Sequence, residues 1–194
     1  WEWHVTRFMD SATALRIPLR QTPDLLSGIT HELIKRNDGP ESILRITLTR
    51  GVGERGYGIS GAKEPTLLIT QHPLPTAPTK ALSLVTTAAR IAVDDPLARV
   101  KSANKLGSVL AKSEAAAHGA DDGLILNSDG NITETSSANI FWVENGALRT
   151  PPVSDGVLPG VTRRLVIGLA PALGKPVHEE SVAPDRLQQA EAVF

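Results

Sequence analysis

Three groups of residues in the second half of the chain have types and spacing that suit chemistry on an amine. Lys101 stands where an apolar, strand-like run ends and a helix begins, so partial desolvation would favour its neutral, nucleophilic amine. Glu134 follows a tight turn and precedes small residues, where a carboxylate can approach a flat ring. Gly160 comes just before a helix start at Val161 and Thr162, whose free N–H groups and dipole favour an anion.

One cofactor, pyridoxal 5'-phosphate, requires all three groups together. Its aldehyde needs an amine, its ring nitrogen needs an anionic partner, and its phosphate needs a cluster of donors. Each group also has an ordinary alternative, namely a solvated surface lysine, a strand-end glutamate facing water, and a plain helix cap. The order from Lys101 through Glu134 to Thr162 is what favours the cofactor.

Hydrophobic periodicity and turn residues predict the elements that must position these groups. Apolar residues at spacings of three and four predict a helix over residues 5–15, and a second helix is expected over 22–36. The alternating and β-branched stretches 43–49, 66–70 and 82–92 are expected to be strands, with a glycine-rich loop at 51–58. In the second half we expect a helix over 102–118, hairpins formed by 124–126 with 132–134 and by 138–144 with 147–150, and a helix from Val161.

This pattern predicts an α/β (α+β) chain of two domains. Its 194 residues are enough for a sizeable core, and the turn at Asp94-Asp95-Pro96 suggests a boundary. We expect a smaller domain over residues 1–92, a linker over 93–99, and a larger domain over 100–194 that carries Lys101. The chain begins without Met and stops within a strand-like run at 190–194, so we expect both domains to be truncated.

Composition narrows the classes of partner. The 20 Lys and Arg residues balance 21 Asp and Glu, and a net charge of −1 gives no field that would collect nucleic acid or an anionic membrane. The chain has no Cys, which excludes disulfides and cysteine-ligated metal centres, and we expect no metal site. No stretch approaches the roughly 20 apolar residues that span a bilayer. A small-molecule partner and a cytoplasmic location are therefore expected.

Four stretches of the sequence resemble a known family. Residues 101–104 (KSAN), 119–122 (GADD), 129–141 (DGNITETSSANIF) and 158–163 (LPGVTR) are similar, in this order, to motifs of the class IV, fold type IV pyridoxal-phosphate enzymes. That family includes branched-chain aminotransferases, D-amino acid aminotransferases and aminodeoxychorismate lyases. The resemblance implies a D-amino acid aminotransferase-like fold of two domains, with the cofactor at the domain interface and a homodimeric assembly.

The resemblance also implies roles for individual residues. Lys101 matches the catalytic lysine that forms the Schiff base, and Glu134 matches the partner of the ring nitrogen. The remaining matches concern the phosphate and the borders of the site: Arg7 within residues 4–7 (HVTR) and Gly160, Val161 and Thr162 at the phosphate, and Ser137 and Ala138 beside the cofactor and substrate. A solvated helix arginine is the alternative for Arg7, but paired N–H donors suit phosphate oxygens.

The reaction is the least determined part of this interpretation. The loop at residues 50–57 (RGVGERGY) resembles a loop of aminodeoxychorismate lyases, and in it Arg55 and Tyr57 are expected to bind a substrate carboxylate. Residues 158–163 resemble the aminotransferases more closely, so we expect an aminotransferase that acts on an amino acid through a Schiff base on Lys101 and proton transfer at the alpha carbon. The alternatives are an aminodeoxychorismate lyase, which releases pyruvate and forms 4-aminobenzoate, and a non-catalytic or fragmentary relative. Substrate identity and stereochemistry stay open.

Overall fold

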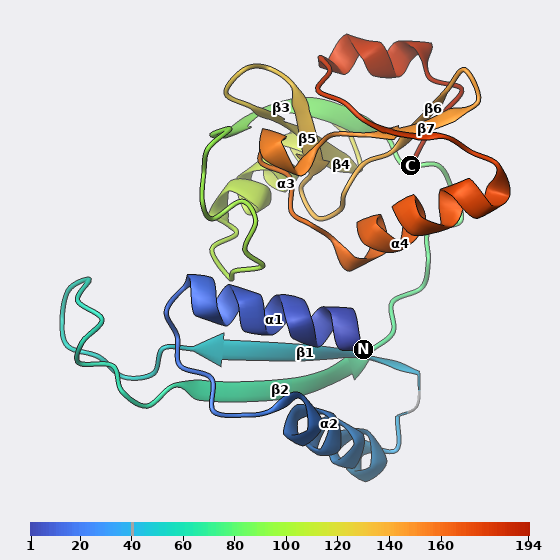
Figure 1. The fold of residues 1–194 in the computed structure, drawn as a ribbon. Helices are drawn as coiled ribbons and strands as arrows, with labels where there is room; N and C mark the ends of the chain where they lie inside the picture. Colours follow the sequence, from blue (N-terminus) through green and yellow to red (C-terminus); the bar gives the residue numbers. More distant parts are fainter. Residues whose placement is uncertain (40) are drawn as a thin grey trace. The chain divides into compact units, whose positions relative to one another are not determined.

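The computed structural model describes residues 1–39 and 41–194, which form two compact units, Trp1–Pro78 and Thr79–Phe194 (Figure 1). The first unit pairs two helices with a two-stranded antiparallel sheet. Its elements are α1 (Glu2–Ala14), α2 (Pro23–Asn37), β1 (Ser42–Thr49) and β2 (Thr66–Pro73). Val5 and Ala12 of α1 and Leu26 of α2 are buried, as the three-and-four spacing of apolar residues requires.

The second unit contains a three-stranded sheet in the order β3-β4-β5, formed by β3 (Leu84–Ile91), β4 (Asp122–Asn127) and β5 (Ile132–Thr135). β3 and β4 run parallel and are joined through α3 (Leu106–Ala117), whereas β4 and β5 form an antiparallel hairpin. Helix α3 packs very closely on the sheet at Gly123. A Cβ placed there would lie 2.7 Å from the Ala111 carbonyl oxygen and 2.7 Å from Thr87 Cγ2. Only glycine permits this approach.

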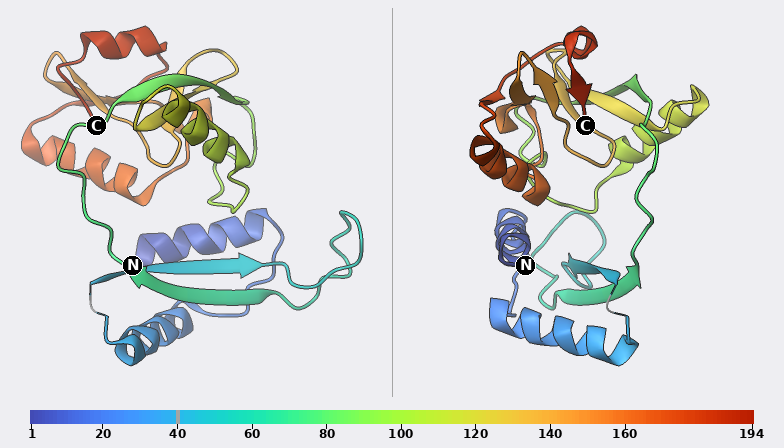
Figure 2. Two further views of the ribbon diagram at one scale, coloured as in Figure 1. Left: turned by 180° about the vertical axis from the view of Figure 1, so that it is seen from behind. Right: turned by 90° about the vertical axis from the view of Figure 1, so that its right-hand side faces the viewer.

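A four-stranded sheet in the order β8-β7-β6-β9 completes the second unit (Figure 2). Its strands are β6 (Trp142–Glu144), β7 (Ala147–Thr150), β8 (Val177–Glu179) and β9 (Ala192–Val193), and the helices beside it are η1 (Val153–Asp155), α4 (Val161–Leu169), η2 (Ala170–Leu173) and η3 (Pro184–Gln189). One buried cluster joins the β4–β5 hairpin to Ile140, and another joins Phe141 and Leu148 to Ala170. Phe141 also stacks on Phe194, with 5.6 Å between ring centroids.

The observed elements confirm the predicted helices and hairpins, with differences at some ends. The helix expected over 102–118 begins only at Leu106, because residues 101–105 form turns closed by Ser102 N–H to the Val100 carbonyl and Lys105 N–H to the Ala103 carbonyl. The strand expected over 138–144 is shortened to Trp142–Glu144.

The division of the chain also differs from the predicted one. We expected the smaller domain to end at residue 92, whereas the first compact unit ends at Pro78. The reason is the pairing of β3, which lies in the expected smaller domain by sequence but forms a parallel ladder with β4. Among the described residues, every helix is too short or too polar to cross a bilayer.

Candidate active site

Glu134 is positioned by the β4–β5 hairpin. Asn127 closes the turn, since its Oδ1 accepts hydrogen bonds from the N–H groups of Asp129 (3.1 Å) and Asn131 (2.9 Å), and Gly130 takes a φ of +84°. The Asn127 side chain is fully buried, so the turn is held by a hydrogen-bonding group inside the fold. The hairpin then aligns Glu134 with Ile125 of β4, and Glu134 forms a bridge with Asn139 on its other side.

The Glu134 carboxylate is half-buried and lies among positive groups. Its Oε2 accepts a hydrogen bond from the Leu158 N–H at 3.1 Å. Burial raises the pKa of Glu134 above its ordinary value, while the Leu158 N–H and the positive charges of Lys105 and Lys101 oppose that rise. Because the Leu158 N–H bonds to Oε2, Oε1 can still accept a hydrogen bond from another donor.

Lys101 follows the buried Val100 and lies in the segment before α3, with its side chain exposed. Its charge acts on the pKa of Glu134, so the lysine and the carboxylate belong to one electrostatic neighbourhood. Lys105 acts on the same carboxylate more strongly than Lys101 does, although the sequence analysis gave it no part in the site. It is half-buried at the N-cap of α3. Its residue type alone does not distinguish it from a surface lysine.

The start of α4 is shaped by a contact between Gly160 and Asn139. Asn139 Nδ2 donates to the Leu158 carbonyl at 2.9 Å, and a Cβ on the buried Gly160 would lie only 2.0 Å from Asn139 Oδ1. The φ of −66° at Gly160 would suit any residue. Glycine is therefore required at this N-cap by the lack of space for a side chain, not by the backbone conformation. The first N–H groups of α4 have no partner within the helix and suit an anion.

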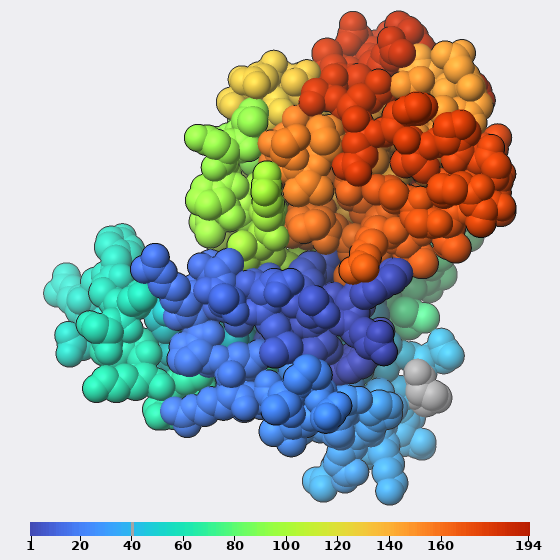
Figure 3. Space-filling view, in the orientation of Figure 1, coloured from blue at the N-terminus to red at the C-terminus, as the bar shows by residue number. Residues whose placement is uncertain are grey.

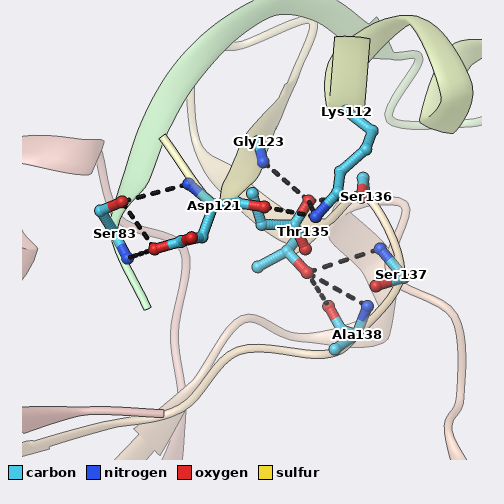
Figure 4. A network of polar contacts seen from close by, with 9 residues as sticks. Ser83, Lys112, Asp121, Gly123, Thr135, Ser136, Ser137 and Ala138 are labelled. Carbon is cyan, nitrogen blue, oxygen red and sulfur yellow. Dashed lines mark hydrogen bonds and ion pairs between the residues drawn. The ribbon is translucent and has the colours of Figure 1, made fainter. Parts of the chain in front are cut away.

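A turn over residues 135–138 joins Glu134 to the next strand (Figure 4). The Thr135 N–H donates to the Ala138 carbonyl at 2.8 Å, and Thr135 Oγ1 accepts from the Ala138 N–H at 3.1 Å. Ser137 and Ala138 are exposed on this turn. Ser136 points the other way, and its hydroxyl donates to Asp122 Oδ1 at the start of β4.

The other three predicted site residues belong to the unit Trp1–Pro78. Arg7 is half-buried on α1, and burial lowers the pKa of its guanidinium, which nevertheless stays charged at neutral pH. Arg55 and Tyr57 are exposed in the loop between β1 and β2, which projects from its unit in teal in Figure 3. Arg50 holds the base of that loop, donating to the carbonyls of Arg16 at 2.7 Å and Leu15 at 2.5 Å.

The structure thus gathers most of the predicted cofactor residues in one unit. Those in Thr79–Phe194 are Lys101, Glu134, Ser137, Ala138, Gly160, Val161 and Thr162. They lie on the loop before α3, the end of β5, the turn after β5 and the start of α4. Together they offer an amine, a half-buried carboxylate and the start of a helix. These are the kinds of group that an aldehyde cofactor with a basic ring and a phosphate requires.

A family model described as amino-transferase class IV matches residues 1–194, and the chain belongs to this family. A Salmonella typhimurium relative named branched-chain-amino-acid aminotransferase is 32% identical over 200 residues, covering 98% of this chain and 64% of its own. A Vibrio harveyi relative named aminodeoxychorismate lyase is 28% identical over 198 residues, covering 100% of this chain and 72% of its own. The chain thus spans less than two thirds of the Salmonella relative.

Solved structures agree with the family assignment. The Escherichia coli branched-chain amino acid aminotransferase matches with a TM-score of 0.92 at 31% identity, over 98% of this chain and 65% of that one. The Thermobaculum terrenum branched-chain amino acid aminotransferase, solved in its PLP-bound holo form, matches with a TM-score of 0.86 at 29% identity, over 100% of this chain and 64% of that one. These matches confirm the predicted α/β fold of the class IV enzymes.

Proposed function

We propose that this chain is part of a pyridoxal-phosphate-dependent aminotransferase that acts on an amino acid, and that Lys101 is its catalytic amine. The observation that carries the proposal is the setting of Glu134. Its half-buried carboxylate is held by the Leu158 N–H and lies within the electrostatic influence of Lys101, so an acid and an amine of suitable character share one neighbourhood. Family membership supplies the reaction class.

The residues present fit the cofactor. Glu134 is a carboxylate held in place with acceptor capacity left at Oε1, which suits a protonated ring nitrogen. We assign the phosphate to the start of α4 at Gly160, Val161 and Thr162, and we keep for Arg7 the phosphate role that the family resemblance implies. Ser137 and Ala138 would border the cofactor on the turn after Glu134. Bound there, pyridoxal phosphate supplies an electron sink for the negative charge that develops at the substrate alpha carbon.

The chain's own groups then have separate tasks. Lys101 Nζ would hold the cofactor, and as a neutral amine it would accept the proton of the substrate alpha carbon. Glu134 keeps a negative charge at the ring nitrogen, which favours that proton's removal. The same amine, once protonated, would serve as the proton donor that regenerates neutral Lys101. A homodimeric assembly, which the family resemblance implies, and a cytoplasmic location, which the composition favours, are further parts of the proposal.

The second candidate is an aminodeoxychorismate lyase, which is favoured by the loop bearing Arg55 and Tyr57. Tyr57 is fully exposed and Arg55 is exposed beside it, so both are free to meet a substrate carboxylate. The Vibrio harveyi relative is named for this activity. The first proton removal is common to both reactions, and the lyase differs in expelling pyruvate.

Absorption spectroscopy tests the proposal. The chain mixed with pyridoxal phosphate should develop the visible band of a lysine-bound cofactor, and Lys101→Ala should abolish it. Lys175→Ala is the matched control, since Lys175 is an exposed lysine of the same unit. A band that survives Lys101→Ala contradicts the proposal, and a complete absence of the band favours the non-catalytic alternative.

Product analysis separates the two reactions. Incubation with an amino acid and a keto acid should exchange the amino group between them if the chain is an aminotransferase. Release of pyruvate from aminodeoxychorismate without any amino acceptor would instead assign the lyase.

A further inference from the structure

Asp122 is a buried carboxylate that the proposed reaction does not use directly. It is the first residue of β4 and is 7% exposed. Its Oδ1 accepts hydrogen bonds from the Ser136 hydroxyl and from the Gly123 N–H, the latter at 2.8 Å. Lys112 Nζ of α3 lies 3.7 Å from the same oxygen. A buried charge with this many partners fixes the groups around it.

Two side chains of the turn over residues 135–138 bond to Asp122 of β4: the Ser136 hydroxyl donates to Oδ1, and Thr135 contributes a second, weaker hydrogen bond. The other bonds drawn for the turn in Figure 4 are internal, between Thr135 and the N–H or carbonyl groups of Ser137 and Ala138. Internal bonds set the shape of a turn but not its place in the fold. The pairing of Thr135 with Leu124 places the beginning of the turn on β4, and the Ser136–Asp122 bond holds the residue that follows it.

The start of β4, where Asp122 lies, is closely packed. Gly123 leaves no space between β4 and its neighbours, with the Ala111 carbonyl oxygen and Thr87 Cγ2 both 2.7 Å from where a Cβ would lie. Next to it, Asp121 Oδ2 accepts from the N–H and the hydroxyl of Ser83, both at 2.8 Å. The start of β4 is thus tied to the segment before β3 and packed on α3.

We propose that Asp122 is a positioning residue, which acts through the Ser136 hydroxyl to hold the turn that carries Ser137 and Ala138 next to Glu134. The inference rests on the proposed function, because it assigns to that turn the border of the cofactor site. Ser136 faces into the protein, which leaves the exposed Ser137 and Ala138 on the opposite side.

The ionised form of Asp122 suits this task. Burial would raise its pKa, but the hydrogen bonds from Ser136, Gly123 and Thr135 and the charge of Lys112 outweigh burial, and the net effect is a lowered pKa. The group therefore remains an acceptor at neutral pH, and its bond to the Ser136 hydroxyl is of the short, charge-assisted kind.

Ser136→Ala is the decisive variant, with Ser83→Ala as its matched control. Each variant removes a serine hydroxyl that donates to a carboxylate: Ser136 to Asp122, and Ser83 to the adjacent Asp121. Only Ser136 lies on the turn. Asp122 keeps its bond to the Gly123 N–H in Ser136→Ala, so folding should be retained. Ser136→Thr keeps a hydroxyl and should therefore show the amide exchange and the cofactor release of the wild-type chain.

Two measurements are compared across these full-length variants. The first is amide hydrogen exchange of Ser137 and Ala138 by NMR without cofactor, and the second is the rate of pyridoxal phosphate release followed by absorbance. Ser136→Ala should raise both by about tenfold, the factor expected for one lost charge-assisted bond. Ser83→Ala should change neither.

Equal values for Ser136→Ala and Ser83→Ala would overturn the inference. Faster exchange with an unchanged release rate would also overturn it, because the turn would then be ordered by Asp122 without serving the cofactor. If the wild-type chain does not bind pyridoxal phosphate, the proposed function has failed, and the exchange rates alone decide whether Asp122 orders the turn.

Discussion

Gly160→Ala should destabilise the chain, although the backbone at this position suits alanine. The φ of −66° and ψ of 144° carry no strain for an L-residue, so the effect isolates one contact. The added Cβ would lie 2.0 Å from Asn139 Oδ1 and 3.2 Å from Asn139 Cγ. The first distance is far below van der Waals contact, and either the Asn139 side chain or the start of α4 must move.

The cost follows from what Asn139 would lose. Rotating its amide away breaks the 2.9 Å bond to the Leu158 carbonyl, which keeps only the Gly160 N–H as a donor, at 2.7 Å. The loss of one such hydrogen bond costs about 0.5–1.5 kcal/mol. If the side chain stays instead, overpacking costs about 1–3 kcal/mol through backbone shifts. We expect the free energy of unfolding to fall by about 1–2 kcal/mol.

Urea unfolding of single and double variants measures this. Gly168→Ala is the control within the same helix, since a Cβ at Gly168 meets nothing within 4 Å and should be neutral or stabilise by up to about 1 kcal/mol. In an Asn139→Ala background, the next nearest atom to the new Cβ is Arg163 Cβ at 3.4 Å, an ordinary contact, so Gly160→Ala should cost little there. An equal penalty in both backgrounds would refute the steric explanation.

Two further substitutions probe buried charges. Burial raises the pKa of Glu134 in the folded chain above its ordinary 4.5, so the carboxyl loses its proton at a lower pH in the unfolded chain than in the folded one. The contribution of this carboxyl to the free energy of unfolding therefore falls as the pH rises from 4.5 through the pKa of the folded chain. Glu134→Gln, which retains an acceptor for the Leu158 N–H, should gain stability relative to wild type as the pH rises above 4.5 in urea unfolding, while weakening the cofactor band; a pH-independent difference would contradict this. Arg163 is 6% exposed and donates to the Pro151 carbonyl at 2.9 Å and to Glu179 at 2.5 Å. Arg163→Ala should lower the free energy of unfolding by about 1–3 kcal/mol, chiefly because the buried Pro151 carbonyl loses its donor while the exposed Glu179 stays solvated, and a loss below about 0.5 kcal/mol would count against a structural role.

Local sequence signals predicted the elements that carry the candidate site. Asp129-Gly130 marked the turn of the β4–β5 hairpin, and the structure places Gly130 at positive φ there. The glycine before Val161 marked the start of α4. These signals succeed because a turn type or a helix end depends on the residues that form it.

Contacts between distant segments were out of reach of the same reasoning. The division at Pro78 follows from the parallel ladder of β3 with β4, whose partners are far apart in sequence, as in Leu84 with Asp122. The role of Asp122 depends on Ser136, which follows an entire hairpin later. Neither side chain carries a local pattern that distinguishes it from a surface residue.

Leu158 shows how the candidate subsites for the ring nitrogen and the phosphate are linked. Its N–H donates to Glu134, and its carbonyl accepts from Asn139, whose amide oxygen in turn excludes any side chain at Gly160. One backbone residue therefore sets both the place of the carboxylate and the start of α4. Two groups that must meet the same rigid cofactor benefit from such a shared anchor, because their separation is then fixed before anything binds.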